Sequence, residues 1–536
     1  MSQPAAATPS ASEKPSTASV AAEVGRQVGL ARAAKNNGDA EGTRRHAEAA
    51  LSALKNVELN YENLDWRQLA EGDAQQLVGN MAGAEKAYRQ AMVAAPQQPG
   101  GYQRLAELLH AQGRTDDFLK HIDLCQRKFP GSPVFFKLLA ARAAANQDYD
   151  IAIPALANAY AADKEDHEAA DALGVCLQNI NHFNEAVLYH ARAMELQPTN
   201  AGYVMRFGLA MAGTEGGNAA AIDLYKMAIA LDPNLYDAYG LLGYELCKVG
   251  RTDDARQIFE SALSCAPDHP VVNFYYGQML QASGDTQQAA AHYDKTVAAA
   301  GVDASSAGFL RDAVRGTTPE HAPQEFVRNM FNLYAPNFEK LLTENFHYRA
   351  PGVLHELLTQ SAVASVRNIK KEKQRILDLG CGTGLMGVLL KPYAERMVGV
   401  DLSANMLARA AEKGIYDETH RADLQAYTAG MPANAFDVVV SADVFIYIGK
   451  LDELFVVLGQ KLAAKSLFAF CCEKLPEAAP EPGFTLQGTA RYAHKDSYIR
   501  ALAKQNGFDV AAFENSPVRQ HAGKPVDAIY YVLARR

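Results

Sequence analysis

A proline recurs in the first half of the chain with a period close to 34 residues. Prolines stand at positions 96, 130, 198, 233 and 267, so the gaps are 34, 68, 35 and 34 residues. Two alanines around a bulky ring keep the same period, in the groups Ala84/Tyr88/Ala91, Ala186/His190/Ala193, Ala221/Tyr225/Ala228 and Ala255/Phe259/Ala262. Self-similarity at a fixed period is typical of architectures in which each unit packs on its neighbours. We therefore predict an array of repeats.

The repeated unit resembles the tetratricopeptide repeat, a helix-turn-helix unit of about 34 residues. The resemblance implies that the alanines let paired helices approach closely while the aromatic rings fill the space between them. We expect about seven units between residues 63 and 301, within a repeat domain over 26–305. Residues 26–60 are predicted to add a less regular helical pair as a cap, after a disordered tail over 1–25.

A glycine-rich loop follows a short apolar strand in the second half of the chain. Residues 375–379 are predicted to form a buried strand that carries Asp378, and Gly380, Gly382 and Gly384 follow at alternate positions. A strand, a glycine-rich turn and a helix form the nucleotide-binding corner of an open α/β sheet. The third glycine comes one residue too early for the dinucleotide motif. Asp378 would repel a pyrophosphate but could pair with a cationic ligand.

Two further acidic residues lie near the next predicted strands. Residues 397–400 are predicted to form a strand, and Asp401 lies 21 residues after Gly380. An acidic residue at this distance is placed to accept hydrogen bonds from ribose hydroxyls. Asp423 comes before a fourth strand predicted over 436–443. Because strand ends on one edge of such a sheet converge on one crevice, these carboxylates are expected to share a ligand.

These motifs in order resemble those of the class I S-adenosylmethionine-dependent methyltransferases, over roughly residues 325–536. The resemblance implies a Rossmann-like domain of seven strands over 306–536, with lid helices over 320–365 and a core over 370–536. The expected fold class is therefore multidomain, with an all-α repeat solenoid followed by this α/β domain. The implied cofactor is S-adenosyl-L-methionine.

The resemblance also implies roles for individual residues around the cofactor. Asp378 would lie near the methionyl end, Asp401 at the ribose, Met406 against the adenine, and Asp423 at the adenine amino group. The other cofactor-binding residues that it implies are Gly380, Cys381, Gly382, Gly384, Leu402, Leu424 and Ser441. Tyr334 and Tyr348 are candidates for aromatic residues that close over the cofactor, and the alternative is that they pack a helix pair.

The segment after the fourth strand faces the methyl group in that family. Here residues 441–447 read Ser-Ala-Asp-Val-Phe-Ile-Tyr. They lack the Asp/Asn-Pro-Pro-Tyr motif with which family members hold planar amide or amino groups, and this disfavours adenine or glutamine-amide methylation. Asp443 and Tyr447 are the candidate catalytic residues, although Asp443 could instead cap a helix.

A second polar group lies between the fifth strand and the following helix, at 491–494. His494 could act as a catalytic base near neutral pH, and Arg491, beside Tyr492, could bind an acceptor carboxylate through two hydrogen bonds. The alternative is a polar loop with His494 near a helix N-cap. Arg519 and His521 are further candidates.

Composition restricts the remaining classes. A chain of 536 residues exceeds one hydrophobic core, so two or more domains are expected. The net charge of −9 disfavours a nucleic-acid partner, and seven cysteines without paired spacing suggest neither disulfides nor a metal site. No apolar run reaches the roughly 18 residues of a membrane span, and the N-terminus lacks the apolar centre of a signal peptide. The expected location is cytoplasmic.

Three functions remain open. The first is a methyltransferase acting on a protein or peptide that binds the concave groove of the repeats. The second is a small-molecule O- or N-methyltransferase whose repeats serve localisation or oligomerisation. The third is a scaffold that binds the cofactor without turnover. The acceptor, the need for a general base and the oligomeric state stay open.

Overall fold

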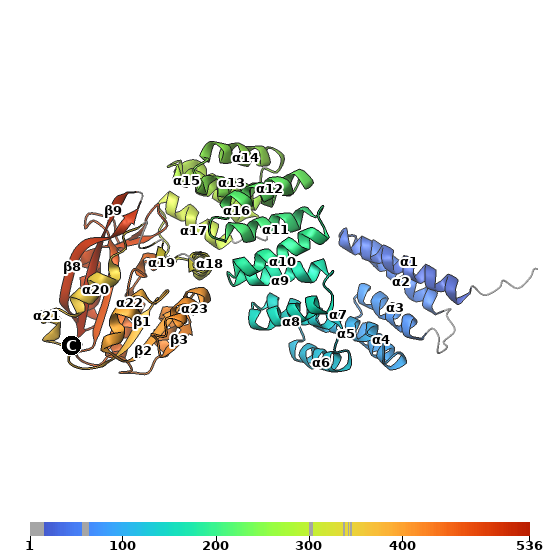
Figure 1. Ribbon diagram of the computed structural model, residues 1–536, viewed down its shortest axis with the longest axis horizontal. Helices are drawn as coiled ribbons and strands as arrows, with labels where there is room; N and C mark the ends of the chain where they lie inside the picture. The colour runs from blue at the N-terminus through green and yellow to red at the C-terminus, as the bar shows by residue number, and fades with distance from the viewer. Residues whose placement is uncertain are drawn as a thin grey trace, which may run out of the picture. The chain divides into compact units, whose positions relative to one another are not determined.

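Helices form the first part of the chain, and a mixed sheet covered by helices forms the last part (Figure 1). The computed structural model describes residues 16–55, 64–299, 304–335, 338–340, 342, 346–521 and 523–536. The chain divides into two compact units, Met1–Cys176 and Leu177–Arg536. The second unit contains the later repeats and the whole sheet. The domain boundary near residue 305 stays a prediction.

The first unit consists of helices that pair along the chain. They are α1 (Thr17–Asn36), α2 (Ala40–Leu54), α3 (Leu64–Leu77), α4 (Met81–Ala94), α5 (Gly100–Ala111), α6 (Thr115–Lys128), α7 (Pro133–Ala145), α8 (Tyr149–Ala162) and the first part of α9 (His167–Asn179). Helix α1 begins after Ser16, whose hydroxyl accepts a hydrogen bond from the Ser19 N–H at 3.2 Å. The expected disordered tail was therefore wrong for residues 17–25, and residues 1–15 lie outside the described residues.

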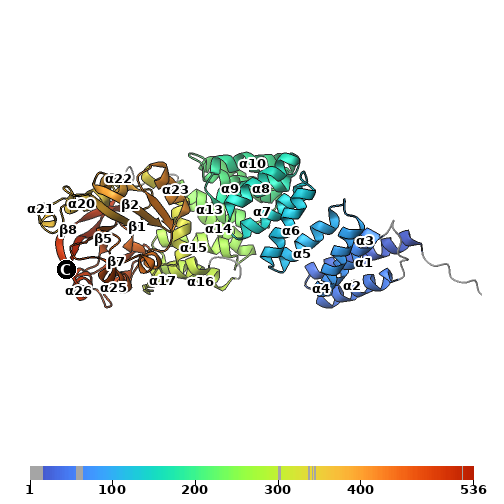
Figure 2. The same ribbon diagram turned by 90° about the horizontal axis from the view of Figure 1, so that it is seen from below.

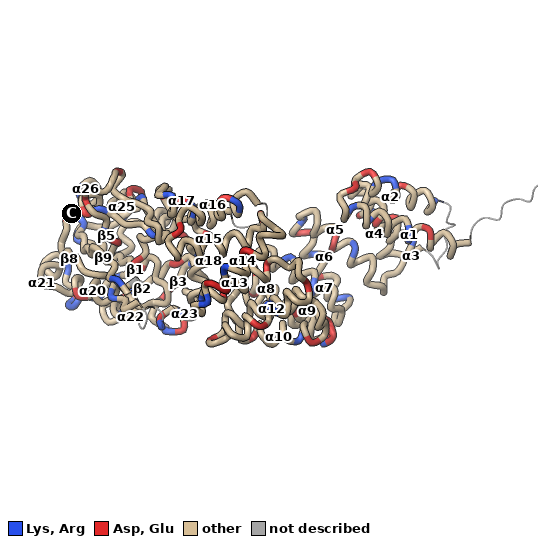
Figure 3. Tube along the Cα trace, turned by 90° about the horizontal axis from the view of Figure 1, so that it is seen from above, with Lys and Arg blue, Asp and Glu red and all other residues tan. Residues whose placement is uncertain are grey.

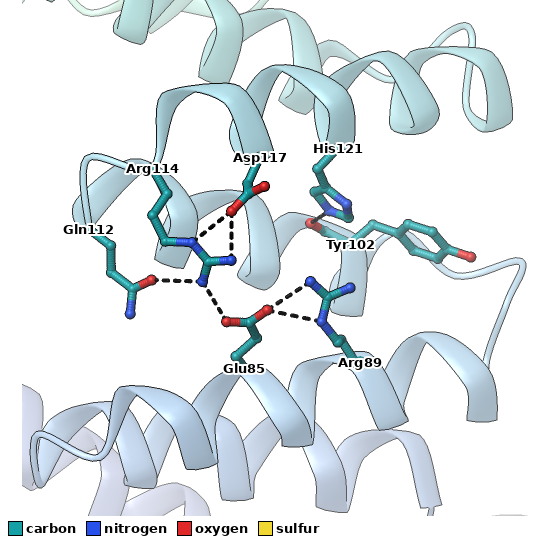
Figure 4. A network of polar contacts seen from close by, with 7 residues as sticks. All are labelled: Glu85, Arg89, Tyr102, Gln112, Arg114, Asp117 and His121. Atoms are coloured by element: carbon teal, nitrogen blue, oxygen red, sulfur yellow. Dashed lines mark hydrogen bonds and ion pairs between the residues drawn. The ribbon is translucent and has the colours of Figure 1, made fainter.

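Close approach between small residues and rings sets the packing of the repeats. Tyr88 of α4 is fully buried, and a Cβ added to Gly72 of α3 would lie 2.3 Å from its ring. Around this core, Glu85 pairs with Arg114 at 2.6 Å and with Arg89 at 2.7 Å (Figure 4). Exposed pairs of this kind each contribute less than about 1 kcal/mol. Ring packing, rather than charge, therefore determines how the helices pair.

The second unit continues the repeats with the same packing. Its repeat helices are the end of α9, then α10 (Phe183–Leu196), α11 (Ala201–Ala212), α12 (Asn218–Leu231), α13 (Tyr236–Lys248), α14 (Thr252–Cys265), α15 (Pro270–Ala282), α16 (Thr286–Ala298) and α17 (Ala304–Arg315). Pro198, Pro233 and Pro267 each stand two residues after the end of a helix, where proline stops helix continuation. The period seen in the sequence is thus the period of helix ends.

A nine-stranded sheet and the helices that cover it form the rest of the described second unit. The strands are β1 (Gln374–Leu379), β2 (Ala394–Asp401), β3 (Glu418–Arg421), β4 (Val438–Ser441), β5 (Leu467–Lys474), β6 (Phe484–Leu486), β7 (Tyr492–His494), β8 (Phe508–His521) and β9 (Lys524–Arg535). Strands β3, β2, β1, β4 and β5 lie in this order and are parallel. Strand β9 pairs antiparallel with β5 and with β8. The sheet thus has the expected Rossmann-like core, with β6 and β7 as an added hairpin.

Helices cover both faces of the sheet. They are α18 (Gln324–Tyr334), α19 (Phe338–Lys340), α20 (Ala350–Leu358), α21 (Ser361–Ala364), α22 (Leu385–Leu390), α23 (Ala404–Glu412), α24 (Leu424–Gly430), α25 (Asp452–Lys461) and α26 (Asp496–Gln505). Figure 2 shows β1, β5 and β7 between α20 and α22 on one side and α25 and α26 on the other. In β1, Leu377 packs towards α25 and Ile376 towards α20, as strand alternation requires. The strands are buried on both faces, which is typical of a doubly wound sheet.

The last repeats and the sheet share one hydrophobic core in the second unit. Tyr276 and Phe309 of the repeat helices lie in the same buried cluster as Phe484 and Tyr492 of the hairpin. The Tyr492 hydroxyl donates to the Pro319 carbonyl at 2.9 Å. The segment between the repeats and the lid helices is therefore held against the hairpin.

Strand β8 was not predicted from the sequence. Its sequence mixes polar residues with Pro517, at a place where the pairing register with β9 shifts. Among the described pairings β8 joins only β9, and such an edge strand tolerates proline. The missed strand has consequences for the site, because it carries Arg519.

Charged residues of both signs are mixed along the described chain (Figure 3). Among the described residues, no helix has the length and apolar character that crossing a membrane requires.

Candidate active site

A cavity of about 420 Å³ lies where the carboxyl ends of β1, β2 and β4 meet the lid helices. Parallel strands end at the same edge of a sheet, so side chains distant in sequence come together there. Of the residues predicted for the site, the cavity is lined by Asp378, Gly380, Cys381, Gly382, Asp401, Leu402, Asp423, Leu424, Tyr334, Tyr348, Asp443, Tyr447 and Arg491.

Asp378 is the last residue but one of the central strand β1 and is almost completely buried. Burial raises its pKa to about 7, the Tyr416 hydrogen bond opposes this shift, and the negative charge of Asp401 adds to it. The Tyr416 hydroxyl donates to Asp378 Oδ2 at 2.6 Å. A buried carboxylate whose ionised form is disfavoured gains from a cationic ligand. This side chain therefore suits the positively charged part of a ligand.

The loop after Asp378 takes a backbone path that requires glycine. Gly380, Gly382 and Gly384 have φ of 70°, 53° and 88°. A Cβ added to Gly380 would also lie 2.4 Å from a methyl carbon of Val444. Cys381 stays a thiol, because burial raises its pKa well above the ordinary value. Gly384 shapes the start of α22 and does not line the cavity.

Asp401, at the end of β2, is oriented by two backbone bonds. Its Oδ2 accepts from the Gly382 N–H at 2.9 Å and its Oδ1 from the Ser403 N–H at 2.8 Å. Desolvation raises its pKa, and these bonds oppose the shift. The carboxylate is thus fixed beside the glycine loop, on the wall of the cavity.

Asp423 caps α24 on the same side of the cavity. Its Oδ1 accepts from the N–H groups of Gln425 and Ala426 at 3.0 and 2.9 Å. Gln425 also lines the cavity, and its Nε2 is shielded from solvent without a hydrogen-bond partner among the described residues. A buried donor of this kind is satisfied when a polar ligand occupies the cavity.

Aromatic residues close the cavity from the lid side. The predicted Tyr334 and Tyr348 line it together with Phe331 and Phe338, which sequence reasoning missed. The rings of Phe331 and Phe338 meet edge to face with centroids 5.8 Å apart. The Tyr348 hydroxyl donates to the Ala442 carbonyl at 3.4 Å, and burial raises its pKa well above the ordinary value. These rings form an aromatic wall of the cavity on the lid side.

The opposite end of the cavity contains a cluster of buried charges. Arg519 of β8 donates from one guanidinium nitrogen to Asp443 and from another to Glu473 at the end of β5. All three are largely buried, and burial raises the pKa of Glu473 although Arg519 lowers it. The carboxylate of Asp443 thus faces Arg519. Asp443 is not the cap of the short 3-10 helix that follows, Phe445–Tyr447, because the cap residue of that helix is Val444.

Two further polar side chains line this end. Burial raises the pKa of Tyr447 to about 12, and the charge of Arg491 opposes the shift. The ring of Tyr447 meets that of Phe331 at 5.4 Å, edge to face. Arg491 ends the turn of the β6–β7 hairpin, where its carbonyl accepts from the Gln487 N–H at 2.8 Å. Sequence reasoning named Arg519 only as a further candidate and assigned Glu473 no role in the site. The available signal for Glu473 was its place at a strand end, since strand ends converge on this edge of the sheet.

His494, predicted as a catalytic residue, does not line the cavity. Its strand is buried on both faces, and its Nε2 lies 2.8 Å from the Gly449 carbonyl. Burial lowers its pKa to about 4, so His494 is neutral at physiological pH. The prediction of a base here is corrected, because the residue belongs to the core. Of His521, only the backbone is described.

Three other predicted residues also lie outside the cavity lining. Tyr492 points into the shared core rather than towards a substrate. The Ser441 hydroxyl donates to the Leu379 carbonyl at 3.0 Å, so it joins β4 to β1. Met406 is fully buried in α23, and Leu402 lies at the cavity in its place. Among the described residues, no group of three or more His, Cys, Asp or Glu is arranged to hold a metal ion.

Two family models match the chain. Residues 376–460 match the model described as a methyltransferase domain, and residues 224–257 match the model of the tetratricopeptide repeat. The matched segments thus stand in the predicted order, with a tetratricopeptide repeat before a methyltransferase domain, and the strand order agrees with the expected Rossmann-like sheet.

Curated methyltransferases match part of the chain. Phosphoethanolamine N-methyltransferase 1 of Zea mays is 30% identical over 129 residues, which are 21% of this chain and 25% of that protein. Magnesium-protoporphyrin O-methyltransferase of Synechocystis is 23% identical over 166 residues, 29% of this chain and 71% of that protein. The chain thus spans about a quarter of the length of the maize relative.

Solved structures of two kinds resemble part of the chain. The structure of the Synechocystis magnesium protoporphyrin IX methyltransferase with bound S-adenosylmethionine is 19% identical, with a TM-score of 0.29, and the match covers 40% of this chain and 97% of that one. A tetratricopeptide-repeat protein with an unusual peptide-binding site is 20% identical, with a TM-score of 0.32, over 35% of this chain and 97% of that one.

Proposed function

We propose that this protein transfers a methyl group from S-adenosylmethionine to an acceptor bound at the Asp443 end of the cavity. One observation carries the proposal: the glycine loop, Asp378, Asp401 and Asp423 line a single cavity. The residues that line the cavity fit the cofactor. Asp378 suits a cationic group, and the Gln425 Nε2 lacks a hydrogen-bond partner among the described residues. When bound, S-adenosylmethionine supplies a methyl group on a positively charged sulfur.

Each cofactor-binding residue would contact a different part of S-adenosylmethionine. Asp378 would hold the ammonium group of the methionyl part, and Asp401 would accept hydrogen bonds from the ribose hydroxyls. Asp423 and Gln425 line the part of the cavity that would hold the adenine ring. The glycines allow the backbone to approach the ligand closely. Phe331 and Tyr334 would cover the ligand and exclude water.

The acceptor would meet the methyl group beside Asp443. The chain then has to align the acceptor atom, and proximity of this kind accounts for much of such a rate enhancement. When the acceptor carries a proton, the carboxylate of Asp443 receives it. Arg519 holds that carboxylate in place, while Tyr447 and Arg491 orient the acceptor.

We propose a protein or peptide as the acceptor, recruited in the cytoplasm by the concave groove of the repeats. The support is the repeat array, since solenoids present long surfaces suited to polypeptides. A small-molecule acceptor is the second candidate, and its support is that the names of the relatives specify small acceptors, phosphoethanolamine and magnesium-protoporphyrin. Repeats would then serve localisation or oligomerisation. A scaffold that binds the cofactor without turnover ranks third.

A labelling experiment separates these candidates. Lysate from a strain that lacks the protein is incubated with purified protein and S-adenosylmethionine labelled in the methyl group. Label in discrete protein bands supports the polypeptide acceptor, whereas label only in the low-molecular-weight fraction contradicts it and favours the small molecule. The matched control is Asp443→Asn, which should lose transfer while it still binds S-adenosylhomocysteine. Binding without transfer to either fraction would favour the scaffold.

A further inference from the structure

The turn between the two helices of a repeat contains a residue with positive φ. Glycine fills this place at 79, 113, 216, 250 and 284, where φ lies between 69° and 86°. Gln147 and Asn181 take it in two repeats, with φ of 62° and 59°. Side chains other than glycine are strained in this region, and asparagine is among those that tolerate it best. Asparagine at position 181 is therefore tolerated, and its side chain can make a contact that glycine cannot make.

Asn181 makes such a contact within the second unit. Its side-chain Nδ2 donates to the backbone carbonyl of Asn332, in the last turn of α18. Carbonyls in the last turn of a helix lack partners within the helix and need other donors. Asn405 of α23 supplies a second amide to the same carbonyl, at 3.4 Å. Two side-chain amides, one from a repeat turn and one from the cofactor domain, therefore bind the end of α18.

The side chain of Asn332 continues the path towards the cofactor site. Its Oδ1 accepts from the Ser403 hydroxyl at 2.6 Å. Ser403 is fully buried and caps α23, since its Oγ accepts from the Met406 N–H at 3.1 Å. The Ser403 N–H donates to Asp401 Oδ1 at 2.8 Å. Hydrogen bonds thus run from a repeat turn through Asn332 and Ser403 to the carboxylate on the cavity wall.

The residues next to Asn332 explain why its position matters. Phe331 precedes it and Tyr334 follows two residues later, and both line the cavity. Any shift of α18 therefore moves the aromatic cover, and any shift of Ser403 moves the bond partner of Asp401. Asn332 controls both, because its main chain holds the helix end and its side chain holds the cap of α23.

We infer that Asn332 is a positioning residue for the cofactor and that Asn181 makes this positioning depend on the repeat array. The inference rests on the proposed function, because it assumes that Asp401 binds the cofactor. Asn181 itself lies outside the cavity lining. A ligand that moves the repeat turn would therefore change cofactor affinity without touching the cofactor.

The test measures the dissociation constant of S-adenosylhomocysteine by titration calorimetry. Asn181→Gly removes the side chain and leaves a residue that suits the turn. We expect the dissociation constant to rise about three- to tenfold, the scale of one lost hydrogen bond. Asn181→Asp keeps the tolerance for positive φ but replaces the donor by an acceptor that faces a carbonyl oxygen. It should weaken binding at least as much.

The matched control is Gln147→Gly, the same change at the equivalent turn of the preceding repeat, 34 residues earlier. Gln147 is exposed, so the dissociation constant of this variant should equal that of the wild type. All variants should keep the wild-type melting temperature without ligand, which separates positioning from general destabilisation. If Asn181→Gly and Asn181→Asp bind within twofold of the wild type, the inference is wrong. If the wild type itself fails to bind, the proposed function fails first.

Discussion

The two ends of the cavity are built in different ways. At the cofactor end, backbone groups determine the geometry: Asp401 accepts from two N–H groups, and Gly380 and Gly382 require left-handed backbone angles. At the acceptor end, side chains from separate strands determine it, since Arg519 joins Asp443 to Glu473. A backbone-built site requires particular residue types at close spacing. A site built from side chains can draw on any strand that the fold brings near.

The comparison predicts different responses to substitution. The acceptor end should lose stability when one charge is removed, because its partners stay buried without compensation. The cofactor end should lose affinity and keep its stability.

Arg519→Met should have the largest effect, because it leaves Asp443 and Glu473 buried without their cation. Removing one partner from a buried ion pair typically lowers the free energy of unfolding by about 3–5 kcal/mol. Scanning calorimetry would follow the transition that S-adenosylhomocysteine shifts upward, since a ligand stabilises only the domain that binds it.

The triple variant Arg519→Met/Asp443→Asn/Glu473→Gln is the control for that loss. It removes all three charges together, so it should be more stable than Arg519→Met alone. A triple variant with the melting temperature of the single variant would show that the charges do not act as a cluster.

Asp401→Ala should weaken S-adenosylhomocysteine binding by about 1–3 kcal/mol, the scale of hydrogen bonds to a charged group. The melting temperature without ligand should change little compared with that of Arg519→Met. Asp509→Ala serves as the control, since Asp509 pairs with Arg536 at 3.0 Å on the exposed surface. Unchanged affinity in a folded Asp401→Ala protein would remove this residue from the site.

Asp378 should make the affinity depend on pH. Its pKa is raised to about 7 in the folded protein, so below that pH the free protein holds a neutral carboxyl group. The ammonium group of S-adenosylhomocysteine binds the ionised form, so affinity should rise as pH increases from about 5.5 to about 7.5. The dependence is limited to about tenfold per pH unit. The Asp378→Asn variant should bind more weakly with a flatter profile, and a wild-type profile as flat as that of this variant would contradict the role.

The same contrast explains what the sequence could predict. The repeats were predictable because prolines mark helix ends, and the glycine loop was predictable because positive φ at Gly380, Gly382 and Gly384 requires glycine. Asp401 was predicted from its distance after Gly380, and Asp423 from the family resemblance. Each of these features depends on local backbone geometry, which a single sequence records directly.

The acceptor end depends on tertiary contacts instead. Arg519 was predicted only as a further candidate, since no strand was predicted around it. In the structure β8 pairs with β9, and Arg519 of β8 binds Asp443. His494 was assigned to a polar loop or a catalytic role because it is a polar residue. In the structure it belongs to a short strand in which every residue is buried. Alternation along the hairpin places Arg491 at the cavity and Tyr492 in the core. Spacing in the sequence did not carry that information.

Titration calorimetry of the wild-type protein with S-adenosylhomocysteine, and separately with NAD, tests the central claim most directly. The claim is that Asp378, Asp401 and the glycine loop form a site for a methyl donor. It predicts saturable binding of S-adenosylhomocysteine at one site per chain, with much weaker binding of NAD. Tighter binding of NAD, or no binding of S-adenosylhomocysteine, would contradict it.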